Sequence, residues 1–427
     1  MTREASIDRA ATSGSRDLDM MRLGAASFLS AGAGYVVLFL AARSLSPNDN
    51  ADFLTFWAFS FMWFGILTGI YTEATRATYR SSKSPEAAGR PLVLVVAVLC
   101  GVSLGLILAV TSPIWSRTIF GEHAASVTPW LCLAVVGFAG HSALMGSLAG
   151  RLHWKTSSRL IAVDSGLRVA LAGVVVVLLA SVAGYAAATA LTTLAWLIFL
   201  CFSSRARGAM RLRADVPLRA FLSRVGLSCL AAASSAALVV GFPVLLRLTS
   251  SEAVYSNSAP LILAIALTRA PLMIPITAYQ GVAITHFMRH RARGIRALLP
   301  IAGVVVVTGA AGSLIAGLIG PWLLQVLAGP SYDIAGRVFA GLTLGATSLA
   351  LLSLTGVLCQ ALDKHRASSM GWLLSLSTAL VLLSLPFSIE TRTVTSLAAS
   401  PVLGIVIHLV AIRGSSQDTP SVTDTAS

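Results

Sequence analysis

The chain has 427 residues, of which 56% are hydrophobic and 11% are charged, and its mean hydropathy is +0.81. Soluble domains carry a charge on about a quarter of their residues, so this composition excludes a water-soluble globular protein and indicates an all-α membrane protein with many spans. The formal net charge of +14 is a signal of membrane topology rather than of nucleic-acid binding, because no basic stretch is supported by a soluble domain.

Twelve apolar stretches along the chain are each long enough to cross a bilayer, which takes about 20 helical residues. They follow a polar N-terminal tail, 1–21, that we expect in the cytoplasm. The first six stretches predict a six-helix bundle over 22–204 and lie at 22–43, 52–74, 91–111, 127–149, 160–180 and 183–203. A basic cytoplasmic linker, 205–221, leads to a second six-helix bundle over 222–413, whose spans lie at 222–246, 256–282, 298–320, 337–361, 368–387 and 394–412. The Ser/Thr-rich end, 414–427, is typical of a disordered cytoplasmic tail.

The distribution of basic residues agrees with this map. With the N-terminus inside, the cytoplasmic segments hold 24 Lys and Arg residues and the opposite side holds 5. Short cytoplasmic loops collect Lys and Arg, and one span more or fewer would destroy the alternation from that point onward. The sequence therefore predicts a multi-pass protein of the cytoplasmic membrane with both termini in the cytoplasm.

A charge near the bilayer centre is costly and is usually functional. Arg269 lies about a dozen residues from either end of the eighth span, hence near the midplane, and Pro271 and Pro275 break the backbone hydrogen-bond ladder directly after it. We expect Arg269 to bind substrate in a cavity. The alternative is a structural arginine that snorkels or pairs with a carboxylate of another helix.

Two further pairs of charges are candidates. Asp164 and Arg168 stand four residues apart in the fifth span, so they share one helix face and can pair, either to line a substrate cavity or to anchor helix packing. Glu73 and Arg76 lie near the cytoplasmic end of the second span, where they serve as a gate or coupling pair or as an interfacial cap.

Uncharged polar groups and absent motifs complete the inventory. Gln280 and Gln360 can offer hydrogen bonds to a polar substrate, although such groups mostly bond neighbouring helices. The five cysteines lie in apolar runs without a metal-ligand pattern, and the sequence lacks GxxxxGK[ST] and HExxH motifs. We therefore expect no cofactor, no metal and no enzyme activity.

Several local stretches resemble one transporter family. They are ARSLSP at 42–47, EATR at 73–76, TRAP at 268–271 and GVLCQALDKHR at 356–366. A modest internal repeat relates 146–152 to 356–362, as in transporters built from two similar halves. With the twelve-span plan, the chain resembles the multidrug/oligosaccharidyl-lipid/polysaccharide (MOP) flippase superfamily, and within it the polysaccharide-transporter branch that includes O-antigen flippases.

This resemblance implies a fold and a function. The fold is two pseudo-symmetric six-helix bundles around a central cavity, and the function is alternating-access transport of a polyprenyl-diphosphate-linked glycan. Arg269 would face the cavity and bind the diphosphate or an acidic sugar. The first and seventh spans carry no charge in their interiors, unlike lipid-carrier flippases of the peptidoglycan branch, which makes a peptidoglycan precursor a poorer candidate substrate.

Two other functions fit the same residues. An ion-coupled multidrug exporter of the same superfamily would need a carboxylate in its cavity, and Glu73 and Asp164 are the candidates. A non-transporting membrane scaffold would instead recruit glycan-assembly or cell-wall enzymes. In every case the chain is expected to contact membrane lipids and no nucleic acid.

Overall fold

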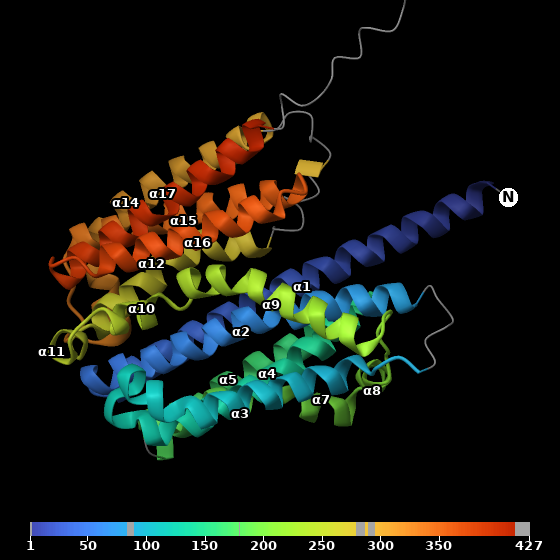
Figure 1. The fold of residues 1–427 in the computed structure, drawn as a ribbon, viewed down its shortest axis with the longest axis horizontal. Coiled ribbons are helices and arrows are strands. Elements are labelled where there is room, and N and C mark those ends of the chain that lie inside the picture. Colours follow the sequence, from blue (N-terminus) through green and yellow to red (C-terminus); the bar gives the residue numbers. More distant parts are fainter. Residues whose placement is uncertain (1, 83–88, 179, 279–286, 289–294, 415–427) are drawn as a thin grey trace, which may run out of the picture. The chain divides into compact units, whose positions relative to one another are not determined.

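The computed structural model describes residues 2–82, 89–178, 180–278, 287–288 and 295–414. Almost all of these residues are helical, and within them the only strand-like pairing is an isolated bridge between Leu92 and Arg213. The chain divides into two compact units, Met1–Ala236 and Ala237–Ser427, which are described separately (Figure 1).

Unit 1 contains the helices from α1 to α8 and most of α9. In chain order these are α1 (Thr2–Ser44), α2 (Pro47–Ser81), α3 (Val93–Phe120), the short 3-10 helix η1 (Gly121–His123), α4 (Ala124–Gly150), α5 (Trp154–Leu178), α6 (Val182–Thr192), α7 (Ala195–Phe202), α8 (Ser204–Met210) and α9 (Leu218–Val239). The last residues of α9, after Ala236, already belong to unit 2.

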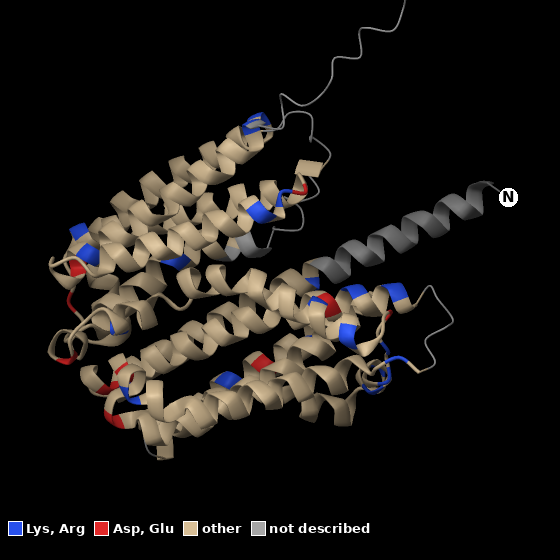
Figure 2. Cartoon of the chain, viewed as in Figure 1, with Lys and Arg blue, Asp and Glu red and all other residues tan. Residues whose placement is uncertain are grey.

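Unit 2 continues with seven described helices. They are α10 (Phe242–Leu248), α11 (Glu252–Tyr255), α12 (Ala259–Ala278), α14 (Leu299–Ala328), α15 (Gly336–Ala361), α16 (His365–Leu383) and α17 (Ile389–Gly414). Most charged residues lie near the helix ends in both units, and only a few interrupt the uncharged stretches between them (Figure 2).

The described helices account for all twelve predicted spans. Ten helical stretches are long and apolar enough to cross a membrane, and one of them, Val93–Gly150, holds both the third and the fourth span. The shorter apolar helix Ala259–Met273 covers the eighth. The predicted all-α architecture is confirmed.

The structure breaks two of these spans. The sixth is divided into α6 and α7 at Thr193 and Leu194. The seventh ends at Val239 rather than at the predicted 246, because Gly241 caps the next helix and Pro243 occupies its first turn. Proline at the start of a helix costs nothing, whereas inside a helix it removes a hydrogen bond, so the apolar run splits at this point.

Glycines bring helices of unit 1 close together. A Cβ added to Gly146 would lie 2.5 Å from the carbonyl oxygen of Tyr71, and one added to Gly150 would lie 2.1 Å from the hydroxyl of Thr78. The spacing of four between these glycines places both on the face of α4 that meets α2. Residues this small are required because two membrane helices pack closely only where their interface lacks bulky side chains.

Unit 2 is organised around α15, which packs against α12, α14, α16 and α17. It is the most buried spanning helix of the unit, and α14 is the least buried. In a membrane the exposed apolar face of α14 therefore meets lipid.

Candidate functional site

Unit 1 encloses a small mixed cavity of about 150 Å³. Helices α1, α2, α4, α5 and α6 contribute to it, so it lies inside the bundle. Its wall combines aromatic rings with charged and hydroxyl groups, from Ser30, Phe61, Phe64, Phe138, His141, Ile161, Asp164, Arg168, Thr189, Thr192 and Thr193.

The predicted pair of Asp164 and Arg168 forms in this cavity. Arg168 Nη2 donates to Asp164 Oδ2 at 2.7 Å, and the two side chains are only 16% and 11% exposed. The guanidinium carbon of Arg168 also lies 5.5 Å from the centre of the Phe61 ring, a cation–π distance. A buried pair in a mixed wall can both neutralise itself and offer a guanidinium to an incoming anion.

His141 is a cavity residue that the charge pattern did not reveal. Its ring stacks on Phe138 with centroids 5.7 Å apart, and its buried Nδ1 has no hydrogen-bond partner among the described residues. It also lines a neighbouring hollow of about 290 Å³ that shares Ser30, Phe138 and Ile161 with the first. The sequence signal that could have identified His141 is that it is an ionisable side chain inside an apolar span.

The break in the sixth span borders the same cavity. Thr192 and Thr193 line it, and Trp196, just beyond the break, donates its indole N–H to the carbonyl of Gly137 at 3.0 Å. This bond ties α7 to α4. The backbone N–H groups of Thr193 and Leu194 remain bonded to the carbonyls of Ala190 and Leu191, so the break changes the direction of the chain without leaving these donors unpaired.

Glu73 and Arg76 form a network at the end of α2. Arg76 Nε donates to Glu73 Oε2 at 2.8 Å, and its Nη2 lies 3.6 Å from Asp215 Oδ1. Asp215 belongs to the basic linker and also lies 3.5 Å from Arg224. The linker is further held by backbone bonds from Val93 to Leu212 and from Ala214 to Pro91. The pair therefore fastens the linker to unit 1; its predicted gate or coupling role stays a prediction.

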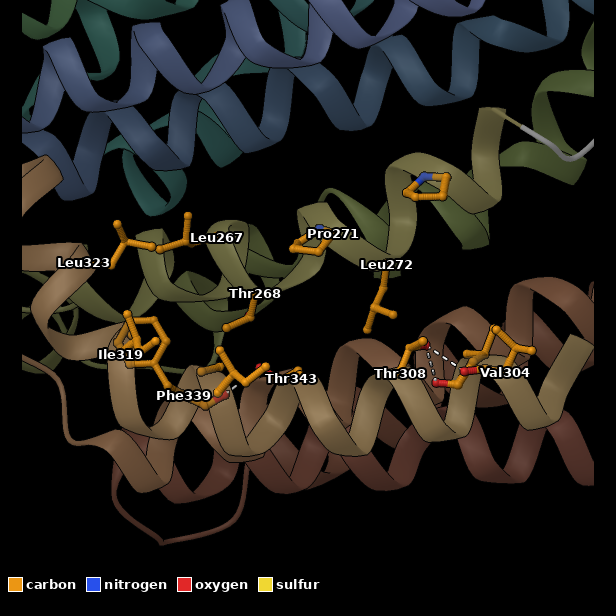
Figure 3. A pocket seen from close by; sticks show the side chains of 16 residues that line it. Leu267, Thr268, Pro271, Leu272, Val304, Thr308, Ile319, Leu323, Phe339 and Thr343 are labelled. Atoms are coloured by element: carbon orange, nitrogen blue, oxygen red, sulfur yellow. Dashed lines mark hydrogen bonds between the residues drawn. The ribbon is translucent and has the colours of Figure 1, made fainter.

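Unit 2 holds a larger cavity, of about 610 Å³, between α12, α14 and α15 (Figure 3). Pro271 and Pro275 lie on its α12 side. None of its described lining residues is charged. The wall consists of Leu267, Thr268, Pro271, Leu272, Pro275, Val304, Val305, Thr308, Gly312, Ile315, Ala316, Ile319, Gly320, Leu323, Phe339 and Thr343.

The three hydroxyl groups of this wall are already satisfied. Thr268 donates to the carbonyl of Ala264 at 2.8 Å, Thr308 to that of Val304 at 2.7 Å and Thr343 to that of Phe339 at 2.9 Å. Each bond runs back along the residue's own helix. The side chains of the described wall residues thus present mostly hydrocarbon to whatever enters the cavity.

Arg269 lies elsewhere. Its side chain is buried, its Nη1 donates to the carbonyl oxygen of Val239 at the end of α9, and its guanidinium carbon lies 5.3 Å from the centre of the Phe242 ring. It does not line the apolar cavity. Gln360 is exposed at the end of α15, and Gln280 lies outside the described residues.

The chain is similar to known proteins both in sequence and in fold. No protein-family model matches it. It is 39% identical over 397 residues to "Uncharacterized protein Rv3630" of Mycobacterium tuberculosis (strain ATCC 25618 / H37Rv), covering 92% of this chain and 91% of that protein. It is equally identical over 392 residues to "Uncharacterized protein Rv1510" of the same strain, covering 92% and 90%.

Solved structures reveal the fold. An inward-facing multidrug resistance MATE family transporter of the MOP superfamily superposes with a TM-score of 0.70 at 14% identity, over 91% of this chain and 96% of that chain. A MOP superfamily transporter from Pyrococcus furiosus Vc1 (DSM3638) gives 0.66 at 15% identity, over 94% and 96%. The chain has the fold of these transporters.

Proposed function

The chain belongs to the family of the mycobacterial proteins Rv3630 and Rv1510 and has the MATE fold, and from this premise we propose that it is a membrane transporter moving a lipid-linked oligosaccharide or polysaccharide precursor across the cytoplasmic membrane. The observation that carries the choice of substrate is the apolar cavity of unit 2. Such a cavity suits a long hydrocarbon chain because its described side chains are apolar except for three threonines, whose hydroxyls are bonded within their own helices.

The polar part of such a substrate needs a different environment. In unit 1, Arg168 offers a permanently charged, planar donor that can bind a phosphate or an acidic sugar through two parallel hydrogen bonds. Asp164 holds this guanidinium in place until an anion competes for it. One hydrocarbon cavity and one polar cavity match the two chemical halves of a lipid-linked glycan.

Deletion of the gene tests the proposal most directly. If the protein flips a lipid-linked saccharide, deletion causes that saccharide to accumulate on the cytoplasmic side, and a plasmid copy of the gene reverses the accumulation. Unchanged pools of all lipid-linked glycans after deletion would rule this function out.

Filling the cavity tests the role of unit 2. A Cβ added to Gly312 meets its nearest atom, in Thr343, at 3.7 Å, so there is room at the wall for a side chain that then enters the cavity. Gly312→Phe should lower export more than about tenfold, because a phenyl ring that fills the cavity excludes the chain sterically, and an exclusion of about 1.4 kcal/mol already corresponds to a factor of ten. Gly303→Phe, on the same helix but outside the cavity and with nothing within 4 Å, is the matched control and should retain export.

The ion pair of unit 1 gives a second test. Replacing Asp164 and Arg168 together with Leu should leave the protein folded, because apolar replacement of a whole buried pair is often neutral. Export should nevertheless fail if the pair binds the polar group. Full export by a normally abundant double variant would exclude both residues from substrate binding.

An ion-coupled multidrug exporter is the second candidate. The observation that favours it is Asp164, a carboxylate within a cavity that also holds His141 and a broken helix, which are groups suited to binding a coupling ion. Drug susceptibility of the deletion strain separates the two functions. Sensitisation to lipophilic cations without glycan accumulation favours drug export.

A further inference from the structure

A broad groove of about 860 Å³ lies in unit 1 where α5 begins and α7 ends. It is separate from the cavities described above, since it shares no lining residue with them. Three cations border it: Lys155 and Arg159 in the first turns of α5, and Arg205 in α8, directly after α7. None of its lining residues is acidic.

The side chains of these three cations form no hydrogen bond or ion pair with the described residues, as is also the case for other arginines of unit 1 such as Arg80, Arg211 and Arg219. Two further arginines of these helices are paired: Arg168 binds Asp164, and Arg207 donates to the carbonyls of Leu200 and Cys201. Three free positive charges on one groove are expected to repel each other unless an anion lies between them.

The same positive charge affects the pKa of a neighbouring histidine. His153 lies in the loop between α4 and α5, and its pKa is lowered from the usual value, first by burial and then by the charges of Arg205 and Arg151. Arg205 thus contributes positive charge on the side of the groove that faces His153.

The rest of the groove is apolar and open. Val163, Ile198 and Phe202 line it from the spanning stretches of α5 and α7, and Ile198 and Phe202 are 48% and 86% exposed. In a bilayer these side chains meet acyl chains, while Lys155, Arg159 and Arg205 stand at the ends of the spans, at headgroup level. The groove is therefore positively charged at headgroup level and apolar along the acyl chains, which matches the polar and apolar parts of a lipid.

We propose that this groove binds the phosphate headgroup of an anionic membrane phospholipid, with Lys155, Arg159 and Arg205 around the phosphate and Ile198 and Phe202 along an acyl chain. The distribution of basic residues predicts that this end faces the cytoplasm, where anionic lipids are abundant. Arginine suits phosphate because its planar group donates two parallel hydrogen bonds. The proposal is independent of what the protein transports.

Binding of defined lipids to the purified full-length protein in neutral detergent tests the site, by native mass spectrometry and by thermal unfolding. Phosphatidylglycerol should bind and stabilise the wild type, more weakly at high salt, and phosphatidylcholine should not. Combined Lys155→Gln, Arg159→Gln and Arg205→Gln substitutions should weaken phosphatidylglycerol binding on the order of 100-fold, since each basic residue near a membrane surface contributes about a factor of five.

A matched control removes the same charge elsewhere. Arg80, Arg211 and Arg219 are exposed, lie on the same predicted side and do not line the groove, so their combined change to Gln should leave binding within about twofold of wild type. Arg159→Lys with Arg205→Lys keeps the charge and should retain most of the binding. Equal loss in the control, or equal binding of phosphatidylglycerol and phosphatidylcholine, overturns the proposal.

A third lipid distinguishes the source of the phosphate. Decaprenyl phosphate added in competition should displace phosphatidylglycerol only weakly if the groove serves a membrane phospholipid. Strong displacement that depends on the same three cations would overturn the assignment to a phospholipid and give the groove to an isoprenoid phosphate.

Discussion

Arg269, Arg392 and Arg207 each donate hydrogen bonds to carbonyls at the C-terminal end of a helix. Arg269 reaches Val239 of α9, Arg392 reaches Leu383 of α16 at 3.1 Å and Thr249 after α10 at 2.8 Å, and Arg207 reaches Leu200 of α7 at 2.9 Å. The last carbonyls of a helix have no partner within it and carry a partial negative charge. A guanidinium donates hydrogen bonds to these carbonyls and also balances their partial negative charge where water is scarce.

Arg269→Ala should therefore destabilise the fold. The substitution removes a charged donor from the end of α9 and should lower the free energy of unfolding by about 1.5 to 3 kcal/mol, with Arg269→Lys in between. Thermal unfolding in detergent measures it. Arg337→Ala, an exposed arginine of α15 without a described partner, should stay within about 0.5 kcal/mol of wild type. An Arg269→Ala protein that unfolds like wild type but fails to transport would return this residue to the substrate site.

At the scale of elements, one buried histidine fixes the meeting point of α15, α16 and α17. His408 is fully buried, its Nδ1 lies 2.8 Å from the hydroxyl of Thr355 in α15, and its Nε2 lies 3.1 Å from the carbonyl of Ser368 in α16. A carbonyl only accepts, so Nε2 donates its proton to Ser368, while the Thr355 hydroxyl contacts Nδ1 and also donates to the carbonyl of Leu352 at 3.0 Å. Both ring nitrogens are thereby bonded, one to α15 and one to α16.

Glycine makes room for this ring. A Cβ added to Gly371 of α16 would lie 2.2 Å from His408 Nε2 and 2.9 Å from the carbonyl of Gly404. Gly371→Ala should therefore destabilise the protein by about 1 to 3 kcal/mol, the usual cost of overpacking. Gly303→Ala, on the exposed face of α14 with nothing within 4 Å, should instead stabilise it by about 0.5 to 1 kcal/mol. Thermal unfolding of the two variants should shift in opposite directions, and shifts of the same sign would contradict the packing.

At the scale of the whole molecule, two sets of contacts in unit 1 agree with the predicted alternation of sides. The bridge between Arg213 and Leu92 joins the predicted cytoplasmic linker to the start of the third predicted span, 91–111, which directly follows a predicted cytoplasmic loop. At the other end of α3, His123 lies 3.3 Å from Asp49 and 3.7 Å from Asp52. His123 and Asp49 fall in two segments predicted to be external, and Asp52 is the first residue of the second predicted span.

Reporter fusions test this topology. Fusions after Arg213 and after Arg296 should report a cytoplasmic location, because both follow clusters of basic residues, and a fusion near Glu122 should report the opposite side. Alkaline phosphatase and green fluorescent protein give complementary signals. A single fusion on the wrong side would overturn the twelve-span map.

The spans could be predicted from the sequence because their signal is local: an apolar run long enough to cross a membrane has few alternatives to a helix. The end of α9 could not, since apolar residues continue through Phe242 to Leu246 and the break depends on Gly241 and Pro243. Spacing was also enough to predict that Asp164 and Arg168 pair. The partner of Arg269 is a backbone carbonyl, a group that every residue carries and no sequence pattern marks.

The cavity of unit 2 was likewise invisible in the sequence, because apolar wall residues look like any other apolar residues. The unit boundary also depends on tertiary contacts: the linker predicted at 205–221 stays bound to unit 1, and the division falls at Ala236.

The hydroxyls of Thr268, Thr308 and Thr343 donate to carbonyls of their own helices and so are not offered to a substrate. This affects how fast a substrate chain enters and leaves the cavity. Lipid tails are as apolar as leucine, so a chain that moves from the bilayer into this cavity exchanges one hydrocarbon solvent for another and gains little free energy. A site without a deep energy minimum fills and empties quickly. The cavity wall therefore suits brief residence of a chain in transit, and any lasting hold on a substrate has to come from its polar head.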